Sequence, residues 1–294
     1  MRTTWTGCGT ALVTPFTTDG VIDEPAIRRL ARRQIDAGMH FLVPCGTTGE
    51  SPTLSREEKR RVVELVVAEA AGKVPVLAGA GGYDTHEVIE AVQEMAAAGA
   101  QGILSVTPYY NKPTQEGLYQ HYRAIAASTP LPIVVYNVPG RTGCNVEPAT
   151  LVRLAAINNI VAVKEASGNP AQIADVIKDA PDDFSVLSGD DELTVPILAL
   201  GGDGLISVVS NVIPRRMAEL VRLGRAGDLS GARALHLELL PWLRAAFLES
   251  NPIPVKAALA MMGRFENVLR SPLVPLDERH ESSVRDALQR VGAL

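Results

Sequence analysis

The sequence has few cysteines and few histidines, and their positions argue against two common kinds of support for a fold. The cysteines, three in 294 residues, lie far apart at Cys8, Cys45 and Cys144. An odd number of scattered cysteines favours free thiols in a reducing cytosol over a disulfide framework. The five histidines never pair at the spacing of metal ligands, which argues against a metal site. We therefore expect a cytoplasmic protein that folds without disulfides or bound metal.

The sequence also lacks a basic run and a long apolar run. Lysine and arginine total 28 against 33 acidic residues, for a net charge of −5, without the basic cluster typical of a nucleic-acid surface. No stretch approaches the ~18 consecutive apolar residues of a membrane span, and the first residues lack the apolar core of a signal peptide. We expect neither nucleic acid nor a membrane as a partner. The hydrophobic fraction of 46% is enough for a folded core.

Short β-like runs alternate with longer helical patterns along most of the chain. Such an alternation is typical of a (β/α)8 TIM barrel, an α/β fold for which roughly 250 residues is a common size. A doubly wound sheet would need a glycine fingerprint after its first strand, and the sequence has none there. The eight predicted strands are Thr10–Thr14, Phe41–Cys45, Pro75–Gly79, Gly102–Thr107, Ile133–Tyr136, Ile160–Lys164, Phe184–Ser188 and Gly204–Ser207.

Helices are predicted between these strands and after the last of them. We assign residues 1–227 to the barrel with its active site and residues 228–294 to a C-terminal helical extension packed on it. The predicted barrel helices are Glu24–Ala37, Arg56–Ala71, Thr85–Ala98, Gln115–Ser128, Pro148–Ala156, Ala171–Ala180, Asp191–Leu200 and Pro214–Gly224. The extension has three predicted helices, Leu229–Glu249, Ile253–Met262 and Glu278–Val291.

Lys164 stands at the end of the apolar run that forms the sixth predicted strand. Burying its ammonium group is costly, and desolvation favours the neutral amine, which is the form that Schiff-base chemistry on a carbonyl requires. A lysine at a strand end can instead extend its charged head into water. Taken alone, the residue favours this second interpretation.

Polar and glycine-rich segments follow the same end of the predicted strands as Lys164. Because a barrel of this kind carries its chemistry at the carboxyl ends of its strands, we expect these segments to surround Lys164. This position favours a catalytic lysine over one that reaches into solvent. The segments are Gly46–Ser51, Pro108–Asn111, Tyr136–Gly143 and Ser188–Asp191.

Three features of these segments suit a carbonyl substrate that carries a carboxylate. The turn Gly46–Gly49 can direct backbone N–H groups at an anion, although a tight turn without a ligand explains the sequence equally well. Because the turn lacks the lysine of a phosphate-binding loop, a carboxylate fits it better than a nucleotide. Tyr136 can either shuttle protons or simply fill the core. Arg141 follows a Pro-Gly turn beside the site and can hold a carboxylate in bidentate fashion.

Two adjacent pairs complete the candidate site. Tyr109 and Tyr110 would lie on opposite faces of an extended segment, so that one of them points away from the centre of this barrel. The acidic pair Asp190–Asp191 opens a predicted helix, and we expect it to cap that helix rather than bind a metal ion.

Together these motifs resemble the signature of the pyruvate-dependent class I aldolases of the N-acetylneuraminate lyase family. The resemblance runs from Gly9–Phe16 to the tail segment Asn251–Lys256, and so covers essentially the whole chain. It implies a (β/α)8 barrel and a reaction that needs neither a metal nor an organic cofactor. The segments that carry it are Gly46–Glu50, Tyr109–Asn111, Tyr136–Pro139, Arg141–Gly143 and Lys164–Glu165.

The resemblance implies roles for the residues around pyruvate. Lys164 would form the Schiff base with pyruvate, and Thr47 and Thr48 would bind the pyruvate carboxylate. Tyr136, Thr47 and Tyr110 would relay protons, with Tyr110 reaching in from a neighbouring subunit. A site shared in this way implies at least a dimer, and the family usually forms a homotetramer, a dimer of dimers.

Within the family, Arg141 matches the synthase branch, because the lyase branch usually lacks an arginine there. In the synthase branch this arginine holds the carboxylate of aspartate semialdehyde, which condenses with pyruvate in the first committed step of diaminopimelate and lysine biosynthesis. Gly189 and Ile206 would place backbone atoms near the bound pyruvate. Two alternatives remain open. One is a sister aldolase that acts on a sugar acid, and the other is a ligand sensor, which would be expected to have lost Lys164 or Tyr136.

The resemblance to lysine-inhibited members of the family is weaker. Those members often have histidines in the helix after the Gly-Thr-Thr-Gly-Glu motif and an asparagine in the third βα loop. This chain has Arg56 and Lys59 in that helix and Tyr83 in that loop, although Glu87 and Tyr109 of the usual set remain. Two added positive charges would repel the lysine ammonium. We therefore expect weak or absent inhibition by lysine.

Overall fold

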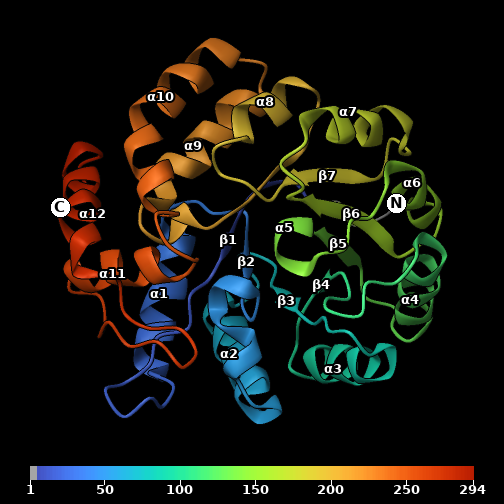
Figure 1. The fold of residues 1–294 in the computed structure, drawn as a ribbon, viewed down its shortest axis with the longest axis horizontal. Helices are drawn as coiled ribbons and strands as arrows, with labels where there is room; N and C mark the ends of the chain where they lie inside the picture. Colours follow the sequence, from blue (N-terminus) through green and yellow to red (C-terminus); the bar gives the residue numbers. More distant parts are fainter. Residues whose placement is uncertain (1–4) are drawn as a thin grey trace.

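A computed structural model describes residues 5–294 and shows eight parallel strands surrounded by helices (Figure 1). Neighbouring strands follow the order β2-β1-β8-β7-β6-β5-β4-β3, and a parallel bridge between Leu42 and Val76 joins the two ends of this order into a barrel. The predicted (β/α)8 barrel is confirmed. Its strands are β1 (Gly7–Ala11), β2 (Phe41–Val43), β3 (Leu77–Gly79), β4 (Gly102–Val106), β5 (Ile133–Asn137), β6 (Ile160–Glu165), β7 (Ser185–Ser188) and β8 (Gly204–Ser207).

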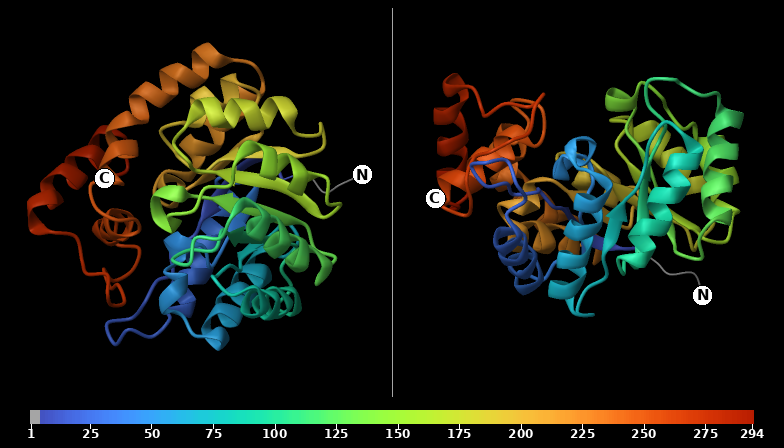
Figure 2. Two further views of the ribbon diagram at one scale, coloured as in Figure 1. Left: turned by 45° about the vertical axis from the view of Figure 1, so that its right-hand side comes forward. Right: turned by 90° about the horizontal axis from the view of Figure 1, so that it is seen from below.

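Helices cover the outside of the barrel and continue beyond it as a C-terminal extension. The last three helices lie together on one side of the barrel, where the chain ends (Figures 1 and 2). None of the helices within residues 5–294 is long and apolar enough to cross a membrane. The helices are α1 (Glu24–Asp36), α2 (Arg56–Ala70), α3 (Thr85–Ala97), α4 (Gln115–Ala127), α5 (Pro139–Thr142), α6 (Pro148–Ala155), α7 (Pro170–Asp179), α8 (Thr194–Ala199), α9 (Pro214–Arg225), α10 (Leu229–Ala245), α11 (Ile253–Met261) and α12 (Glu278–Arg290), with short 3₁₀ turns η1 (Thr47–Gly49), η2 (Ser51–Thr53) and η3 (Val209–Asn211).

Local sequence explains where many of these helices begin. Ser55 starts α2 with a capping box: its hydroxyl accepts the Glu58 N–H at 3.2 Å, and the Glu58 carboxylate accepts the Ser55 N–H at 2.9 Å. Asp84 caps α3 in a similar way through the N–H groups of its first turn. These caps satisfy donors that a helix cannot satisfy itself. They therefore fix the residues at which the loops end and α2 and α3 begin.

The inside of the barrel is filled at the amino ends of its strands. Trp5 and Phe41 meet edge to face with ring centroids 5.3 Å apart, and both belong to the buried cluster inside the barrel. A Cβ atom on Gly102 would lie 2.4 Å from the Trp5 ring, so a glycine is needed there. Among the described residues this end is packed with side chains, and the carboxyl ends of the strands, where we expect Lys164, are the end at which barrels of this kind carry their sites.

The first strand is present, but its predicted bounds are wrong. We predict Thr10–Thr14, whereas β1 spans Gly7–Ala11. Glycine is a poor strand former by propensity, but here it permits close packing, because a Cβ atom on Gly9 would overlap the Phe41 ring at 2.0 Å. The requirement comes from the neighbouring strand and is invisible in the local sequence.

Two further differences lie beyond strand ends. Helix α5 occupies Pro139–Thr142, where the Pro-Gly pair suggests a turn, and α8 begins only at Thr194 instead of Asp191. Helix α10 begins at Leu229, just after the predicted division between residues 227 and 228, but this division into two units stays a prediction.

Candidate active site around Lys164

Lys164 lies on β6 with its side chain buried in the site. In the parallel register it pairs with Tyr136 of β5 on one side and Leu187 of β7 on the other. Only 4% of its surface is exposed, and its Nζ lies 4.1 Å from the centroid of the Tyr136 ring. The side chain therefore does not extend into water, and the interpretation of Lys164 as a solvated strand end is wrong.

Gly189 makes room for this lysine. A Cβ atom at Gly189 would lie 2.7 Å from the Ala166 Cβ and 3.0 Å from the Lys164 Cε. Any larger residue would therefore force the Lys164 side chain to move. Ile206, the other residue expected to supply backbone near the site, is fully buried in the barrel interior, in the same cluster as Tyr136.

A cavity of about 440 Å³ opens beside Lys164. This volume is within the range of small-molecule sites. Five of the eight predicted site residues line it: Thr48, Tyr136, Arg141, Lys164 and Gly189. Residues that we did not predict complete the lining, among them Asp190, Glu192, Leu243, Arg244, Phe247 and Asn251. Four of these come from the C-terminal extension, in α10 and the segment after it, which therefore forms one wall of the cavity.

A second cavity of about 630 Å³ adjoins the first and shares Tyr136, Val138 and Arg141 with it. Thr47 and Tyr110 line this second cavity, so the two cavities together take in every predicted site residue except Ile206. A substrate bound at Lys164 could thus reach the residues of both cavities through Tyr136 and Arg141.

Tyr109 and Tyr110 both line the second cavity but differ in burial, and Tyr110 does not have the extended backbone that we predict. Tyr109 packs edge to face on Tyr83 with ring centroids 5.3 Å apart, and burial together with the nearby Tyr83 and Glu87 raises its pKa. Tyr110 has a left-handed backbone with φ of 72° and is 91% exposed. Tyr110 therefore lines the second cavity with most of its side chain exposed.

Arg141 owes its position to the short helix α5. The hydroxyl of Thr142 donates to the Val138 carbonyl at 3.2 Å and accepts from the Thr107 hydroxyl, also at 3.2 Å. These bonds fasten α5 to the end of β5 and the segment after β4. The exposed guanidinium of Arg141 thereby stands over both cavities, and it has no carboxylate partner among the described residues.

The hydroxyl-rich turn is held by residues from both ends of the chain. Asn251 Nδ2 donates to Thr48 Oγ1 at 2.8 Å, and the Thr14 hydroxyl donates to the Gly49 carbonyl at 2.7 Å. Both donors are buried, so two hydrogen bonds shielded from solvent fix the turn. The tail motif that contains Asn251 is visible in the sequence, but its contact with Thr48 is not.

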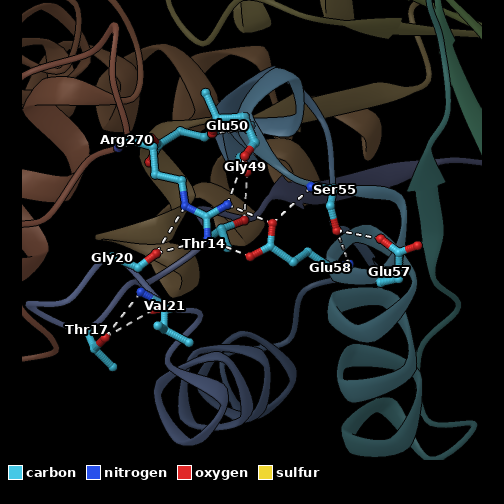
Figure 3. Close-up of polar contacts among 11 residues, drawn as sticks. Thr14, Thr17, Gly20, Val21, Gly49, Glu50, Ser55, Glu57, Glu58 and Arg270 are labelled. Atoms are coloured by element: carbon cyan, nitrogen blue, oxygen red, sulfur yellow. Dashed lines mark hydrogen bonds and ion pairs between the residues drawn. The ribbon is translucent and has the colours of Figure 1, made fainter.

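A buried ion pair anchors the end of the same turn. Lys256 Nζ lies 2.6 Å from Glu50 Oε1 and also donates to the Thr14 carbonyl at 2.9 Å, and both charged side chains are fully buried. Burial lowers the pKa of Lys256, while the Glu50 carboxylate opposes this shift. Figure 3 shows that Arg270 also approaches Glu50 and binds Glu58 and the Gly20 carbonyl. Residues of the C-terminal extension thus contact the end of the turn through Lys256 and Arg270.

Asp191 is not the helix cap that we predict. Its carboxylate is fully buried and accepts hydrogen bonds from the Ser207 hydroxyl at 2.5 Å and the Val208 N–H at 2.9 Å. These bonds tie the loop after β7 to the end of β8. Burial raises the pKa of Asp191 to about 6, against the lowering effect of the bonds from Ser207 and Val208.

Glu165 follows Lys164 but serves a different part of the structure. Its buried carboxylate accepts from Asn137 Nδ2 at 3.0 Å and from the Ser167 N–H at 2.7 Å, and burial raises its pKa. It lines neither cavity. This carboxylate is therefore not placed to contact a molecule bound in either cavity.

The cysteines are buried and unsuited to catalysis. Burial raises the pKa of Cys45 to about 12, and it also raises the pKa of Cys8 and Cys144, so the thiols stay protonated at neutral pH. In the part of the chain that the structure covers, residues 5–294, no three His, Cys, Asp or Glu side chains are grouped so as to hold a metal ion.

The fold and site define a (β/α)8-barrel protein with a buried lysine placed for imine chemistry on a small carbonyl compound. The dihydrodipicolinate synthetase family matches residues 4–291 of this chain. The chain belongs to this family, which confirms the resemblance seen in its sequence motifs.

Individual relatives agree over the whole length. A 4-hydroxy-tetrahydrodipicolinate synthase of Koribacter versatilis is 54% identical over 289 residues, which cover 98% of this chain and 96% of the relative. A dihydrodipicolinate synthase of Acinetobacter baumannii, solved in complex with pyruvate, is 42% identical with a TM-score of 0.97, covering 99% of this chain and 100% of the other. A solved monomeric variant of dihydrodipicolinate synthase is 48% identical with a TM-score of 0.97, covering 99% and 98%.

Proposed function

We propose that this protein condenses pyruvate with L-aspartate 4-semialdehyde to give 4-hydroxy-tetrahydrodipicolinate, through a Schiff base on Lys164. The observation that carries the proposal is the buried Lys164 beside Tyr136 in a cavity that also contains Arg141. The full-length relative from Koribacter versatilis has the name of this synthase, and the one from Acinetobacter baumannii was solved with pyruvate. The same reaction would begin the diaminopimelate and lysine pathway.

In the first step the neutral amine of Lys164 attacks the carbonyl carbon of pyruvate, and water leaves as the imine forms. Thr47 and Thr48 bind the pyruvate carboxylate through their hydroxyls and the N–H groups of the turn. Asn251 holds the Thr48 hydroxyl at 2.8 Å, which fixes the direction of that contact. Gly189 and Ile206 leave space and backbone atoms beside the bound molecule.

In the second step the imine, protonated on nitrogen, loses a methyl proton and becomes a neutral enamine. Tyr136 packs against Lys164, with its ring centroid 4.1 Å from Nζ, and it passes protons to Thr47 and Tyr110. The enamine carbon then attacks the aldehyde carbon of aspartate semialdehyde, and the aldehyde oxygen takes up a proton. Finally the amino group of the new chain attacks the imine carbon, which closes the ring and frees Lys164.

Arg141 selects the aldehyde. Its exposed guanidinium stands over both cavities and can hold the second carboxylate in a bidentate pair. This placement favours aspartate semialdehyde over the sugar aldehyde that a sister aldolase would join to pyruvate, because such an aldehyde has hydroxyl groups but no carboxylate for the guanidinium to bind. The sister aldolase is therefore the less favoured candidate.

Borohydride reduction in the presence of pyruvate tests the proposal. It should trap one pyruvate-derived adduct on Lys164, found by mass spectrometry of the digested protein, and Lys164→Ala should abolish trapping and condensation. Lys73→Ala, which changes an exposed lysine away from the cavities, is the control. Trapping on Lys164→Ala, or turnover of N-acetylneuraminate in place of aspartate semialdehyde, would contradict the proposal.

We further propose that the active enzyme is a cytoplasmic homotetramer in which Tyr110 completes the site of a neighbouring copy. Tyr110 is 91% exposed in the single chain, at the edge of the second cavity. Mixed oligomers of Lys164→Ala and Tyr110→Phe chains test this, because only a shared site can combine one intact lysine with one intact Tyr110 from another chain. Activity above that of either variant alone is expected. Mixtures no more active than the separate variants would place Tyr110 outside the relay of its neighbour.

A further inference from the structure

A separate cavity of about 850 Å³ lies on the outside of the barrel, between α1, the start of α9 and the chain after α11 and α12. The ribbons show α1 beside the C-terminal helices in the views of Figures 1 and 2. This cavity shares no lining residue with either cavity of the candidate active site. It is therefore a different site, on the other side of the barrel wall.

The lining of this outer cavity is strongly basic. It contains six arginines and a single acidic residue, Asp36, although the whole chain has a net charge of −5. The positive side chains come from three distant segments and meet only in the fold. They are Arg29, Arg32, Arg33, Arg215, Arg216 and Arg264.

Three of the arginines already have partners. Arg32 pairs with Glu69 at 2.6 Å, Arg216 pairs with Glu238 at 2.7 Å, and Arg33 donates to the Asn211 carbonyl at 2.6 Å. The other three, Arg29, Arg215 and Arg264, are exposed and have no carboxylate within 4.0 Å among residues 5–294. Half of the basic lining is therefore free to bind an anion.

The positive charges in this cavity are close enough to oppose one another. Burial lowers the pKa of Arg33, and the nearby charge of Arg264 lowers it further. Arg215 and Arg216 lie in the first turn of α9, which has no acidic residue, and Ile213 before it offers no side-chain cap. Cations at the start of a helix meet its positive end and are unfavourable there. A bound anion would offset both kinds of repulsion.

We propose that the outer cavity binds a small molecule that carries a polyphosphate chain. A guanidinium presents paired donors that match phosphate oxygens, and several in one cavity suit several linked phosphates. Apolar side chains, among them Leu30, Ile213, Met262 and Phe265, share the lining and can contact an attached non-polar group. The volume is within the range of ligand sites.

A nucleic acid fits these observations less well. Its phosphates would need a basic surface that continues beyond one concave site, whereas this chain is acidic overall and gathers its free arginines in a single cavity. Binding of an oligonucleotide in preference to a small polyphosphate is therefore an outcome that would overturn the proposal.

Isothermal titration of the full chain with ATP and with inorganic triphosphate tests the proposal, with AMP and sulfate at matched ionic strength as reference ligands. Both triphosphates should bind with one site per chain and clearly more tightly than AMP or sulfate. Equal affinity for the two triphosphates would show that the cavity recognises the phosphate chain alone. Tighter binding of ATP would show that the apolar lining also contributes to the affinity.

Variants that each lose one arginine charge test whether the triphosphate binds in the outer cavity. Arg29→Gln, Arg215→Gln and Arg264→Gln should each weaken triphosphate binding on the order of tenfold, the typical value of a hydrogen bond to a charged group. Arg233→Gln removes an exposed arginine outside the cavity and should leave binding unchanged. Equal weakening in Arg233→Gln, or affinity for sulfate equal to that for triphosphate, would reduce the effect to general charge and overturn the proposal. Pyruvate trapping on Lys164, measured on each variant, separates this result from the proposed condensation.

Discussion

Asn251 and Thr48 are 203 positions apart in the sequence, and a buried hydrogen bond of 2.8 Å joins them above the barrel. Asn251 comes just before α11, whereas Thr48 belongs to the turn that we propose binds the pyruvate carboxylate. The bond fixes the Thr48 hydroxyl in one direction. The C-terminal extension therefore takes part in the site, beyond covering the barrel.

Replacing Asn251 with alanine should raise the KM for pyruvate more than it lowers kcat. A lost bond of this kind costs about 1 to 3 kcal/mol when its partner stays buried, or roughly fivefold to a hundredfold in affinity. Steady-state kinetics with pyruvate varied would measure the change. Asn267→Ala is a matched control, since Asn267 also has a buried side-chain oxygen without a partner among the described residues but lies outside both cavities. An unchanged KM in Asn251→Ala would exclude the positioning role.

Lys256→Met should lower the free energy of unfolding by about 3 to 5 kcal/mol, because it leaves the Glu50 carboxylate buried without its partner. Replacing both members, as Lys256→Met with Glu50→Gln, should restore part of that loss. Urea unfolding at a fixed protein concentration gives the comparison. If the double variant is less stable than Lys256→Met, the unpaired buried charge of Glu50 is not the cause of the lower free energy of unfolding.

Gly189→Ala should slow imine formation on Lys164. The new methyl group would lie 3.0 Å from Lys164 Cε and 2.7 Å from the Ala166 Cβ, so the lysine must shift out of its place. The rate of borohydride trapping with pyruvate reports the effect. Gly82→Ala is the matched control, because its Cβ would meet only Val88 at an ordinary 3.4 Å and lies outside both cavities. Similar rates for the two variants would show that the lysine does not need this space.

How far the sequence predicts each feature depends on how local that feature is. Strands and helices alternate with clear periods, and the carboxyl ends of all strands meet in a parallel barrel, so the sequence alone places Lys164 among its neighbours. The contacts of Asn251 and Lys256 cannot be predicted in this way, because they join segments about two hundred residues apart. The start of β1 depends on the Phe41 ring, which forbids a side chain at Gly9.

The pH dependence of stability should show the buried Asp191. Burial raises its pKa in the folded state to about 6 from the ordinary 3.8, so the folded protein holds this proton more tightly than the unfolded chain. The contribution of Asp191 is therefore fully present below pH ~4 and is lost as the pH rises through about 6, a change on the order of 3 kcal/mol. Unfolding near pH 5 should release about one proton from this group.

Urea unfolding between pH 4 and pH 7 should thus give a flatter profile for Asp191→Asn than for the parent. Asp182→Asn, which changes an exposed aspartate, should keep the parent slope. If Asp191→Asn and the parent have equal slopes, another group holds the proton.

Inhibition by lysine should be weak, and Lys59 should be the main reason. The guanidinium of Arg56 lies 2.8 Å from Glu90 and 3.6 Å from Glu94, so its charge is already compensated. Lys59, in contrast, lines the second cavity together with Tyr109 and has no carboxylate partner among the described residues. Two like charges about 4 Å apart in water repel each other by about 1 kcal/mol, which corresponds to roughly a fivefold change in affinity. Lys59→Gln should therefore increase sensitivity to lysine about fivefold, and Arg56→Gln should change it much less. Initial rates over a lysine titration measure both. Strong inhibition of the unaltered enzyme at physiological lysine would refute the prediction.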